Sequence, residues 1–97
     1  MRRAARLDAN HGAIRDGLRK LGMFVWDCSS AGNGGPDLMV WRGGWFALEI
    51  KDGTKSPSRR ALTPAEAAFH AALEAKGGRV WVVHDLGQAL EVTRRDV

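Results

Sequence analysis

The feature that most constrains this chain is a pair of strand-like runs around the dipeptide Gly43-Gly44. Residues 37–41 and 45–51 are dominated by strand-forming residues, and two consecutive glycines suit a tight turn with positive φ. The pattern predicts an antiparallel hairpin of Asp37–Trp41 with Trp45–Lys51. The other predicted elements are placed relative to this hairpin.

Helices and further strands are predicted on both sides of the hairpin. The clearest signal is the N-cap Thr63, with proline at the first helical position and Glu66 as the reciprocal capping residue. Helical or strand-like apolar patterns define the other elements. In order, we expect a helix over Asp8–Leu21, strands Met23–Trp26, Asp37–Trp41 and Trp45–Lys51, a helix from Thr63 to Lys76, strand Val80–Val83, and a last helix from Asp85 through Leu90.

This order of elements predicts an α/β (α+β) fold in one domain over residues 1–97. A helix between the third and fourth strands implies a right-handed crossover to a parallel partner. The expected architecture is therefore a mixed four-stranded sheet flanked by helices.

Composition excludes several classes of protein. The chain has 97 residues with 15 Lys+Arg and 11 Asp+Glu, a formal net charge of +4, and ordinary apolar content. Its single cysteine, Cys28, cannot form an internal disulfide or a Cys-rich zinc site. No run approaches the ~20 apolar residues of a membrane span, and the N-terminus lacks a signal-peptide pattern. We expect a cytoplasmic protein without a membrane partner.

Three charged side chains converge in the predicted hairpin. Alternation along a strand places Glu49 and Lys51 on one face, and the hairpin brings Asp37 to the same end. Two neighbouring carboxylates repel each other unless a cation lies between them. Oxygen ligands without Cys or His favour Mg²⁺ or Mn²⁺, which keep waters and bind substrate phosphate. The constellation therefore indicates phosphodiester hydrolysis, with Lys51 orienting or deprotonating the attacking water or adding positive charge to the transition state.

Two loops next to this constellation suit a nucleic-acid substrate. The segment 31–36 before Asp37 is half glycine and would let a DNA backbone approach closely. The polar segment after Lys51 carries Lys55, Arg59 and Arg60, which are candidates for phosphate contacts.

The residues in this order resemble a known family. Pro36-Asp37 followed by Glu49-Ile50-Lys51 resembles the PD-(D/E)XK motif of the restriction-endonuclease-like superfamily. The segments "GNGGPDLMVWRGGWFALEIKDG" and "ALTPAEAAFHAALEAKGG" are similar to the small stand-alone VRR-NUC nucleases of phages and prophages.

The resemblance implies a core of the form αβββαβ, often dimeric, that cleaves DNA with Mg²⁺ or Mn²⁺. It also implies the preference for branched DNA, such as Holliday junctions, that some members of the family have. By the same match Asp37 and Glu49 would be metal ligands, Ile50 would offer its backbone carbonyl, and Lys51 would be the catalytic lysine. Asn10 would occupy the first-helix position where the superfamily frequently has glutamate.

Other interpretations of several residues stay open. Asn10 suits a helix cap as well as a metal ligand, and Glu66 suits the capping box as well as the cleft. His70 lies four residues after Glu66 on the same helical face, where it could contact DNA phosphate or be part of the packing. Trp41 and Trp45, at the ends of the hairpin strands, are candidates for a homodimer interface.

The sequence therefore predicts a metal-dependent DNA endonuclease acting on duplex or branched DNA. Two alternatives remain. One is a non-catalytic nucleic-acid-binding module with a nuclease fold, and the other is an inactive subunit that needs a partner.

Overall fold

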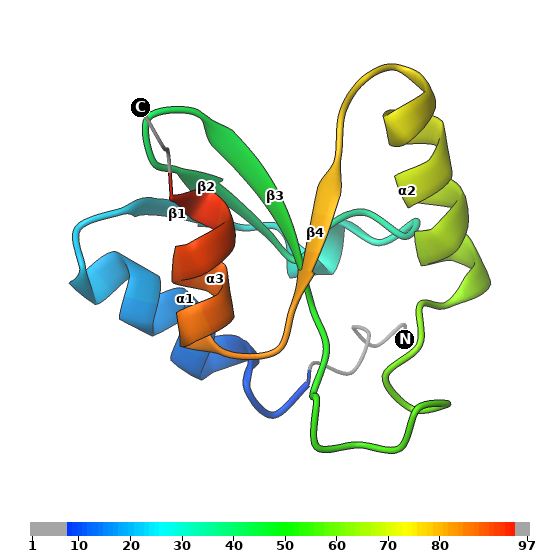
Figure 1. Ribbon diagram of the computed structural model, residues 1–97, viewed down its shortest axis with the longest axis horizontal. Coiled ribbons are helices and arrows are strands. Elements are labelled where there is room, and N and C mark those ends of the chain that lie inside the picture. The colour runs from blue at the N-terminus through cyan, green and yellow to red at the C-terminus, as the bar shows by residue number, and fades with distance from the viewer. Residues whose placement is uncertain (1–7, 95–97) are drawn as a thin grey trace.

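The computed structural model describes residues 8–94 as one four-stranded sheet with three α-helices and a short 3-10 helix (Figure 1). In chain order the elements are α1 (His11–Lys20), β1 (Phe24–Asp27), η1 (Ser29–Ala31), β2 (Leu38–Trp41), β3 (Trp45–Ile50), α2 (Pro64–Ala75), β4 (Val80–Val83) and α3 (Leu86–Thr93). The N-terminal residues whose composition argued against a signal peptide lie outside the described residues. Across residues 8–94, every helix is too short or too polar to span a bilayer.

The predicted helices and strands are all present, and their ends differ from the prediction by three residues at most. The first helix begins later than predicted, at His11, because Asn10 is its N-cap. The last helix continues to Thr93, whose side chain is fully buried and donates a hydrogen bond to the Ala89 carbonyl at 2.8 Å. The 3-10 helix η1 occupies a segment that was predicted as loop.

The sheet has the order β1-β2-β3-β4 and is mixed, as predicted. Strands β1, β2 and β3 pair antiparallel, and β3 pairs parallel with β4 across the α2 crossover. The register aligns Leu38 of β2 with Leu48 of β3, and Leu48 with Trp81 of β4. This register places Leu48 in the middle of the sheet, where its side chain points to the inner face.

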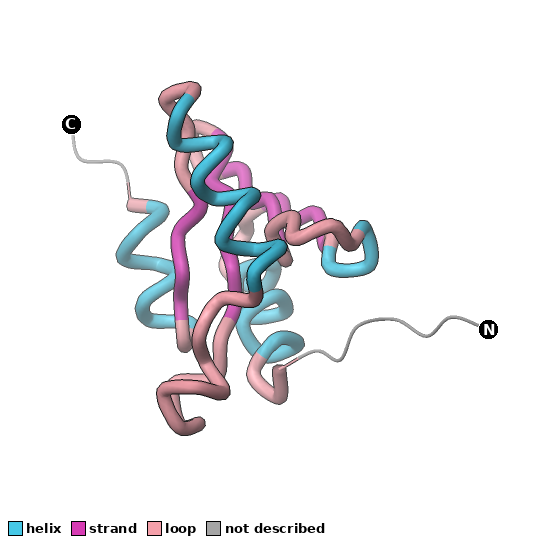
Figure 2. The backbone as a smooth tube through the Cα atoms, turned by 90° about the vertical axis from the view of Figure 1, so that its right-hand side faces the viewer, coloured by secondary structure: helices cyan, strands magenta, loops and turns pink. Residues whose placement is uncertain are grey.

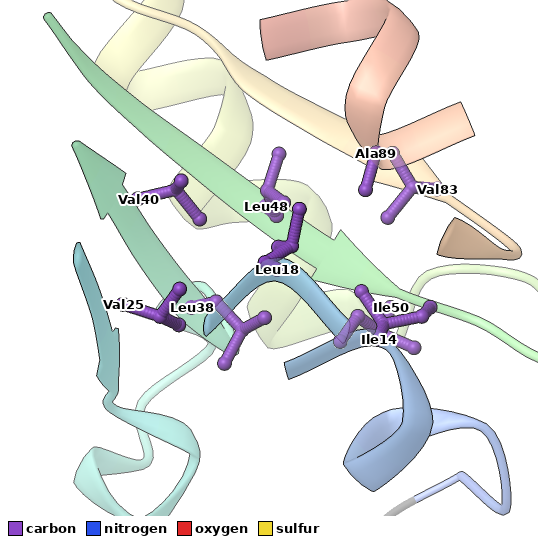
Figure 3. Packing of buried hydrophobic residues seen from close by; sticks show 9 residues of the cluster. All are labelled: Ile14, Leu18, Val25, Leu38, Val40, Leu48, Ile50, Val83 and Ala89. Carbon is purple, nitrogen blue, oxygen red and sulfur yellow. The ribbon is translucent and has the colours of Figure 1, made fainter. Parts of the chain in front are cut away.

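The hydrophobic core lies between the inner face of the sheet and the helices α1 and α3 (Figure 3). The two helices pack against each other, α1 packs on β1, and α3 packs on β4. The buried cluster comprises Ile14, Leu18, Val25, Leu38, Val40, Leu48, Ile50, Val83 and Ala89. Because all the strand residues among these share one face, the residues between them point to the outer face.

Helix α2 stands apart from α1 and α3, beyond β4 in Figure 1, and lies in front of the strands when the molecule is seen from its side (Figure 2). Thr63 caps this helix with the predicted capping box, since its side chain accepts from the Glu66 N–H and Glu66 accepts from the Thr63 N–H. Within residues 64–75, His70 is the one buried side chain. The helix thus approaches the outer face of the sheet mainly through polar groups.

The glycine-rich segment before β2 packs closely against the start of α2. Gly34 has a φ of 78°, and a Cβ on it would collide with the backbone carbonyl of Ala65. Gly77, just after α2, also has a positive φ, 91°, but a Cβ there would meet nothing within 4 Å. A side chain at position 34 would therefore push α2 away from the loop.

We predict that Gly34→Ala destabilises the protein more than Gly77→Ala does. Both substitutions place an alanine at a positive φ, and only the first adds overpacking, which costs about 1–3 kcal/mol. The melting temperature of Gly34→Ala should be lower by about 5–20 °C relative to Gly77→Ala, measured by circular dichroism. Equal melting temperatures would contradict the close approach of the loop to α2.

Candidate active site

A cavity of about 250 Å³ lies where the ends of β2 and β3 meet the glycine-rich loop and the start of α2. Its walls carry acidic side chains, one lysine and the nearly bare backbone of the loop. The lining residues are Asp8, Ser29, Gly32, Asn33, Gly34, Gly35, Asp37, Glu49, Ile50, Lys51, Thr63 and Glu66. The structure thus brings together Asp37, Glu49 and Lys51, as the hairpin pattern predicted, and Ile50 lies between them in the cavity wall.

Asp37 is held in the cavity wall by hydrogen bonds within the hairpin. Its backbone N–H donates to the Leu48 carbonyl at 2.9 Å, which continues the β2–β3 ladder. Its carboxylate Oδ2 accepts a hydrogen bond from the Ile50 N–H at 2.8 Å. Because both contacts come from β3, the carboxylate is held in a defined position beside Glu49 and Ile50.

Glu49 is buried on the outer face of β3, with 1% of its surface exposed. Its Oε1 has no hydrogen-bond partner among residues 8–94. Burial, followed by the neighbouring carboxyl groups of Asp37 and Glu66, raises the pKa of Glu49 to about 9. A buried carboxyl group next to two others has to hold a proton or be compensated by a positive charge.

Lys51 forms an ion pair with Glu66 across the cavity, with 2.8 Å between Nζ and Oε1. Burial lowers the pKa of Lys51, but the hydrogen bond and charge of Glu66 outweigh it, so the pKa is above its usual value. Burial likewise raises the pKa of Glu66, but the hydrogen bonds from Lys51 and the Thr63 N–H lower it below normal. Both groups are therefore charged at neutral pH.

Glu66 consequently serves both functions that the sequence left open. Its Oε1 closes the capping box on the Thr63 N–H at 2.9 Å and also accepts from Lys51. The helix cap therefore positions the lysine of the cavity as well as starting α2.

Asn10 lies beside a second cavity instead of the first one. Its Nδ2 donates to the backbone carbonyls of His84, at 2.6 Å, and Lys51, at 3.2 Å. Its side chain makes no cap hydrogen bond to α1. Asn10 thus anchors the end of the Lys51 strand to β4, and its predicted role as a ligand stays a prediction.

The predicted DNA-binding residues fall in three places. Lys55 and Arg59 are exposed on the loop after β3. Arg60 donates to the Gly53 carbonyl at 3.0 Å and lines the second cavity with Asn10. Glu66 lies in the first cavity, whereas His70 is buried behind it, 3.5 Å from Glu49. With 7% of its surface exposed, His70 has little surface with which to contact DNA.

Sequence reasoning missed Asp8 and Ser29, which also line the first cavity. Asp8 precedes α1 and contributes a negative charge that favours protonated Lys51. Ser29 follows β1, and its hydroxyl donates to Asp27 at 2.7 Å. The available sequence signal for Asp8 was a carboxylate just before the first helix. The side of the sheet on which that carboxylate lies depends on the tertiary fold.

A polar network fixes the position of Ser29. Asp27 accepts hydrogen bonds from the Ser29 N–H and from Arg15, and it lies 3.1 Å from the His11 ring nitrogen. Burial raises the pKa of Asp27, but these bonds outweigh it and hold the pKa well below its usual range. The charged Asp27 therefore ties α1, β1 and the start of the glycine-rich loop together.

The donor set of the cavity suits a hard cation. Asp37 and Glu49 offer carboxylate oxygens, and magnesium sites in proteins commonly use one or two carboxylates with waters. In the part of the chain that the structure describes, no group of three or more His, Cys, Asp or Glu side chains is arranged to hold a metal ion. A cation here would thus be held by two carboxylates, and it would compensate the buried charge of Glu49.

Comparisons with known proteins identify the fold. No family model matches the sequence, and no curated protein matches it. The structure is similar to a solved structure described as a VRR_NUC domain, with a TM-score of 0.61 and 26% sequence identity. The match covers 88% of this chain and 95% of that chain. The chain has a VRR-NUC-like nuclease fold, which confirms the predicted resemblance and the predicted fold class.

We predict that Glu49→Gln stabilises the metal-free protein at alkaline pH. Between its ordinary pKa of 4.5 and about 9, the folded protein keeps a proton on Glu49 that the unfolded chain releases. This difference lowers the free energy of unfolding as the pH rises through that window. In EDTA, the variant should melt about 5–10 °C above wild type at pH 8 and at the same temperature at pH 4.

The matched control for this experiment is Glu74→Gln. Glu74 is an exposed residue of α2, the helix whose His70 lies against Glu49. This substitution removes one carboxylate without touching the cavity, so its melting curve should follow that of wild type at both pH values. A Glu49→Gln profile parallel to wild type from pH 4 to pH 8 would show that Glu49 is not buried in its acid form.

Proposed function

We propose that this chain, which has a VRR-NUC-like fold, is a metal-dependent DNA endonuclease that hydrolyses phosphodiester bonds. The observation that carries the proposal is the placement of Asp37, Glu49 and Lys51 in one cavity at the end of the central hairpin. Paired carboxylates suit a divalent cation, and that cation together with the ammonium group would suit a substrate with negative charge on its oxygens. The nuclease-like fold supports the same chemistry.

Asp37 and Glu49, with the backbone carbonyl of Ile50, would hold Mg²⁺ or Mn²⁺. When bound, the ion supplies a Lewis acid that acidifies a water molecule and offsets the charge on the phosphate. Asp37 is pre-positioned for this role because the Ile50 N–H fixes one of its oxygens. Glu49 would hold the cation in its carboxylate form, since a nearby positive charge favours that form.

Lys51 is suited to stabilise charge and not to accept a proton. Its ion pair with Glu66 raises its pKa, so the side chain is an ammonium group at neutral pH. Of the roles that the sequence left open, this favours positive charge on the transition state over deprotonation of the attacking water. Glu66 holds the ammonium group in the cavity, next to the carboxylates that would bind the cation.

The surroundings of the cavity suit a nucleic-acid backbone. The loop from Gly32 to Gly35 lines the cavity with little side-chain bulk. On the other side, Lys55 and Arg59 are exposed on the loop that follows Lys51. Basic side chains near a hydrolytic site hold phosphates without reading base sequence. We therefore propose that DNA is selected by its shape, with branched DNA such as Holliday junctions among the substrates.

We also propose that the protein acts as a homodimer. Phe24, Trp41 and Trp45 form an exposed aromatic cluster at one end of the outer sheet face, with 62%, 47% and 52% of their surface exposed. Trp45 contacts both other rings edge to face. Exposed aromatic clusters of this kind are typical of protein interfaces. A two-fold dimer would present two cavities, as a junction with two equivalent strands requires.

We predict that wild-type protein has twice the chain mass of 10.6 kDa in solution, measured by light scattering after gel filtration. Trp41→Lys with Trp45→Lys should raise the dissociation constant of the dimer at least about tenfold, because aromatic anchors dominate interface energies. Leu21→Lys, at an equally exposed apolar residue after α1, is the control and should leave the mass unchanged. A monomeric wild type would refute the dimer.

We predict that the protein cleaves labelled DNA in Mg²⁺ or Mn²⁺ and not in EDTA. The panel comprises single-stranded, duplex, flap and four-way-junction DNA. Asp37→Asn should abolish cleavage, because it removes a metal-binding charge while keeping an acceptor for the Ile50 N–H. Lys51→Ala should slow the single-turnover rate about 10²–10³-fold with DNA binding largely retained, because it removes charge from the transition state.

Lys55→Ala is the matched control for Lys51→Ala, since it removes an exposed lysine four residues away. It should weaken binding and leave the single-turnover rate at saturating protein unchanged. DNA binding without metal-dependent cleavage, unaffected by Asp37→Asn, would instead identify a non-catalytic binding module. Cleavage that appears only with a second protein would identify an inactive subunit.

A further inference from the structure

His70 and Glu49 form an isolated polar pair beneath the cavity. His70 Nε2 lies 3.5 Å from Glu49 Oε1, and the two residues are 7% and 1% exposed. Neither atom has a hydrogen-bond partner elsewhere in residues 8–94. His70 Nε2 and Glu49 Oε1 therefore face each other.

Burying such a pair has a cost that packing alone does not explain. A buried polar atom without a hydrogen bond costs about 1–3 kcal/mol, and an apolar side chain of similar volume would avoid that cost. The surrounding helix is rich in alanine, so apolar residues are available in this environment. A polar residue at position 70 is explained better by a function for Glu49 than by packing.

The spacing along α2 matches the spacing along β3. Glu49 and Lys51 are two residues apart on a strand, about 6.6 Å at 3.3 Å per residue. Glu66 and His70 are four residues apart on a helix, about 6 Å at 1.5 Å per residue. The helix therefore offers one partner to each strand residue, with Glu66 on Lys51 and His70 on Glu49.

We propose that His70 is a positioning residue for Glu49. Its Nε2–H donates to Oε1 of the carboxylate and leaves the other oxygen directed to the cavity for the cation. The two atoms are 3.5 Å apart and not hydrogen-bonded in the structure, and the contact would shorten to the usual hydrogen-bond distance of about 2.9 Å once Glu49 holds the cation as a carboxylate. Ligating carboxylates and histidines commonly depend on such outer partners for their orientation. This inference rests on the proposed metal-dependent function.

The test measures Mn²⁺ affinity without DNA, by the electron paramagnetic resonance signal of free Mn²⁺, for three variants of His70. His70→Gln keeps a donor near the Nε2 position, His70→Asn places its amide short of that position, and His70→Leu removes the donor at similar volume. We expect Gln to stay within about threefold of wild type and Leu and Asn to bind at least about tenfold more weakly. At saturating Mn²⁺, His70→Gln should cleave DNA at the wild-type rate.

Each outcome has a definite meaning. Equal Mn²⁺ affinity in wild type, His70→Gln and His70→Leu, with equal melting temperatures, would overturn the role of His70 and leave the nuclease proposal intact. Wild-type protein that neither binds Mn²⁺ nor cleaves DNA would overturn the proposed function and this inference with it. If His70→Leu fails to fold, equal affinities of His70→Gln and His70→Asn would still refute a donor at the Nε2 position.

Discussion

Burial of the Glu49 carboxyl on the outer face of β3 is the constraint on which the rest of the site depends. The same strand places Leu48 and Ile50 in the core, and alternation then forces Glu49 to the opposite face. A carboxyl group enclosed there, beside Asp37, is unfavourable as an isolated charge. The stable solutions are a proton or a bound cation, and the proposed function depends on the second of them.

Helix α2 is the element that completes this site, although it adds little to the hydrophobic core. Its start is fixed by the capping box and by the close approach of Gly34 to the Ala65 carbonyl. Two polar pairs join it to the hairpin, one to Glu49 of β3 and one to Lys51 just after that strand. Since the core lies on the other face of the sheet, α2 can be specialised for the site without loss of packing elsewhere.

Much of this arrangement was predictable from local patterns. The Gly43-Gly44 turn determines the hairpin, and the hairpin brings Asp37 beside Glu49 and Lys51, because a short turn fixes the register of its two strands. The capping box predicted the start of α2 correctly. The side of the sheet on which α2 lies, and hence the burial of His70 against Glu49, depends on a crossover whose path no local pattern contains. The same holds for Asp8, which enters the cavity from a segment far from the hairpin in sequence.

By itself the sequence determined the elements, their order, the mixed sheet and the carboxylates and lysine of the hairpin, because periodicity, turn residues and capping residues act over a few neighbouring positions. Tertiary structure alone decided which further side chains reach the site. It assigned Glu66 to Lys51, His70 to Glu49, and Asn10 to the backbone carbonyls of Lys51 and His84. Those pairings join residues 15 to 74 positions apart in the sequence, and only the packing of α2 and α1 around the sheet brings them together.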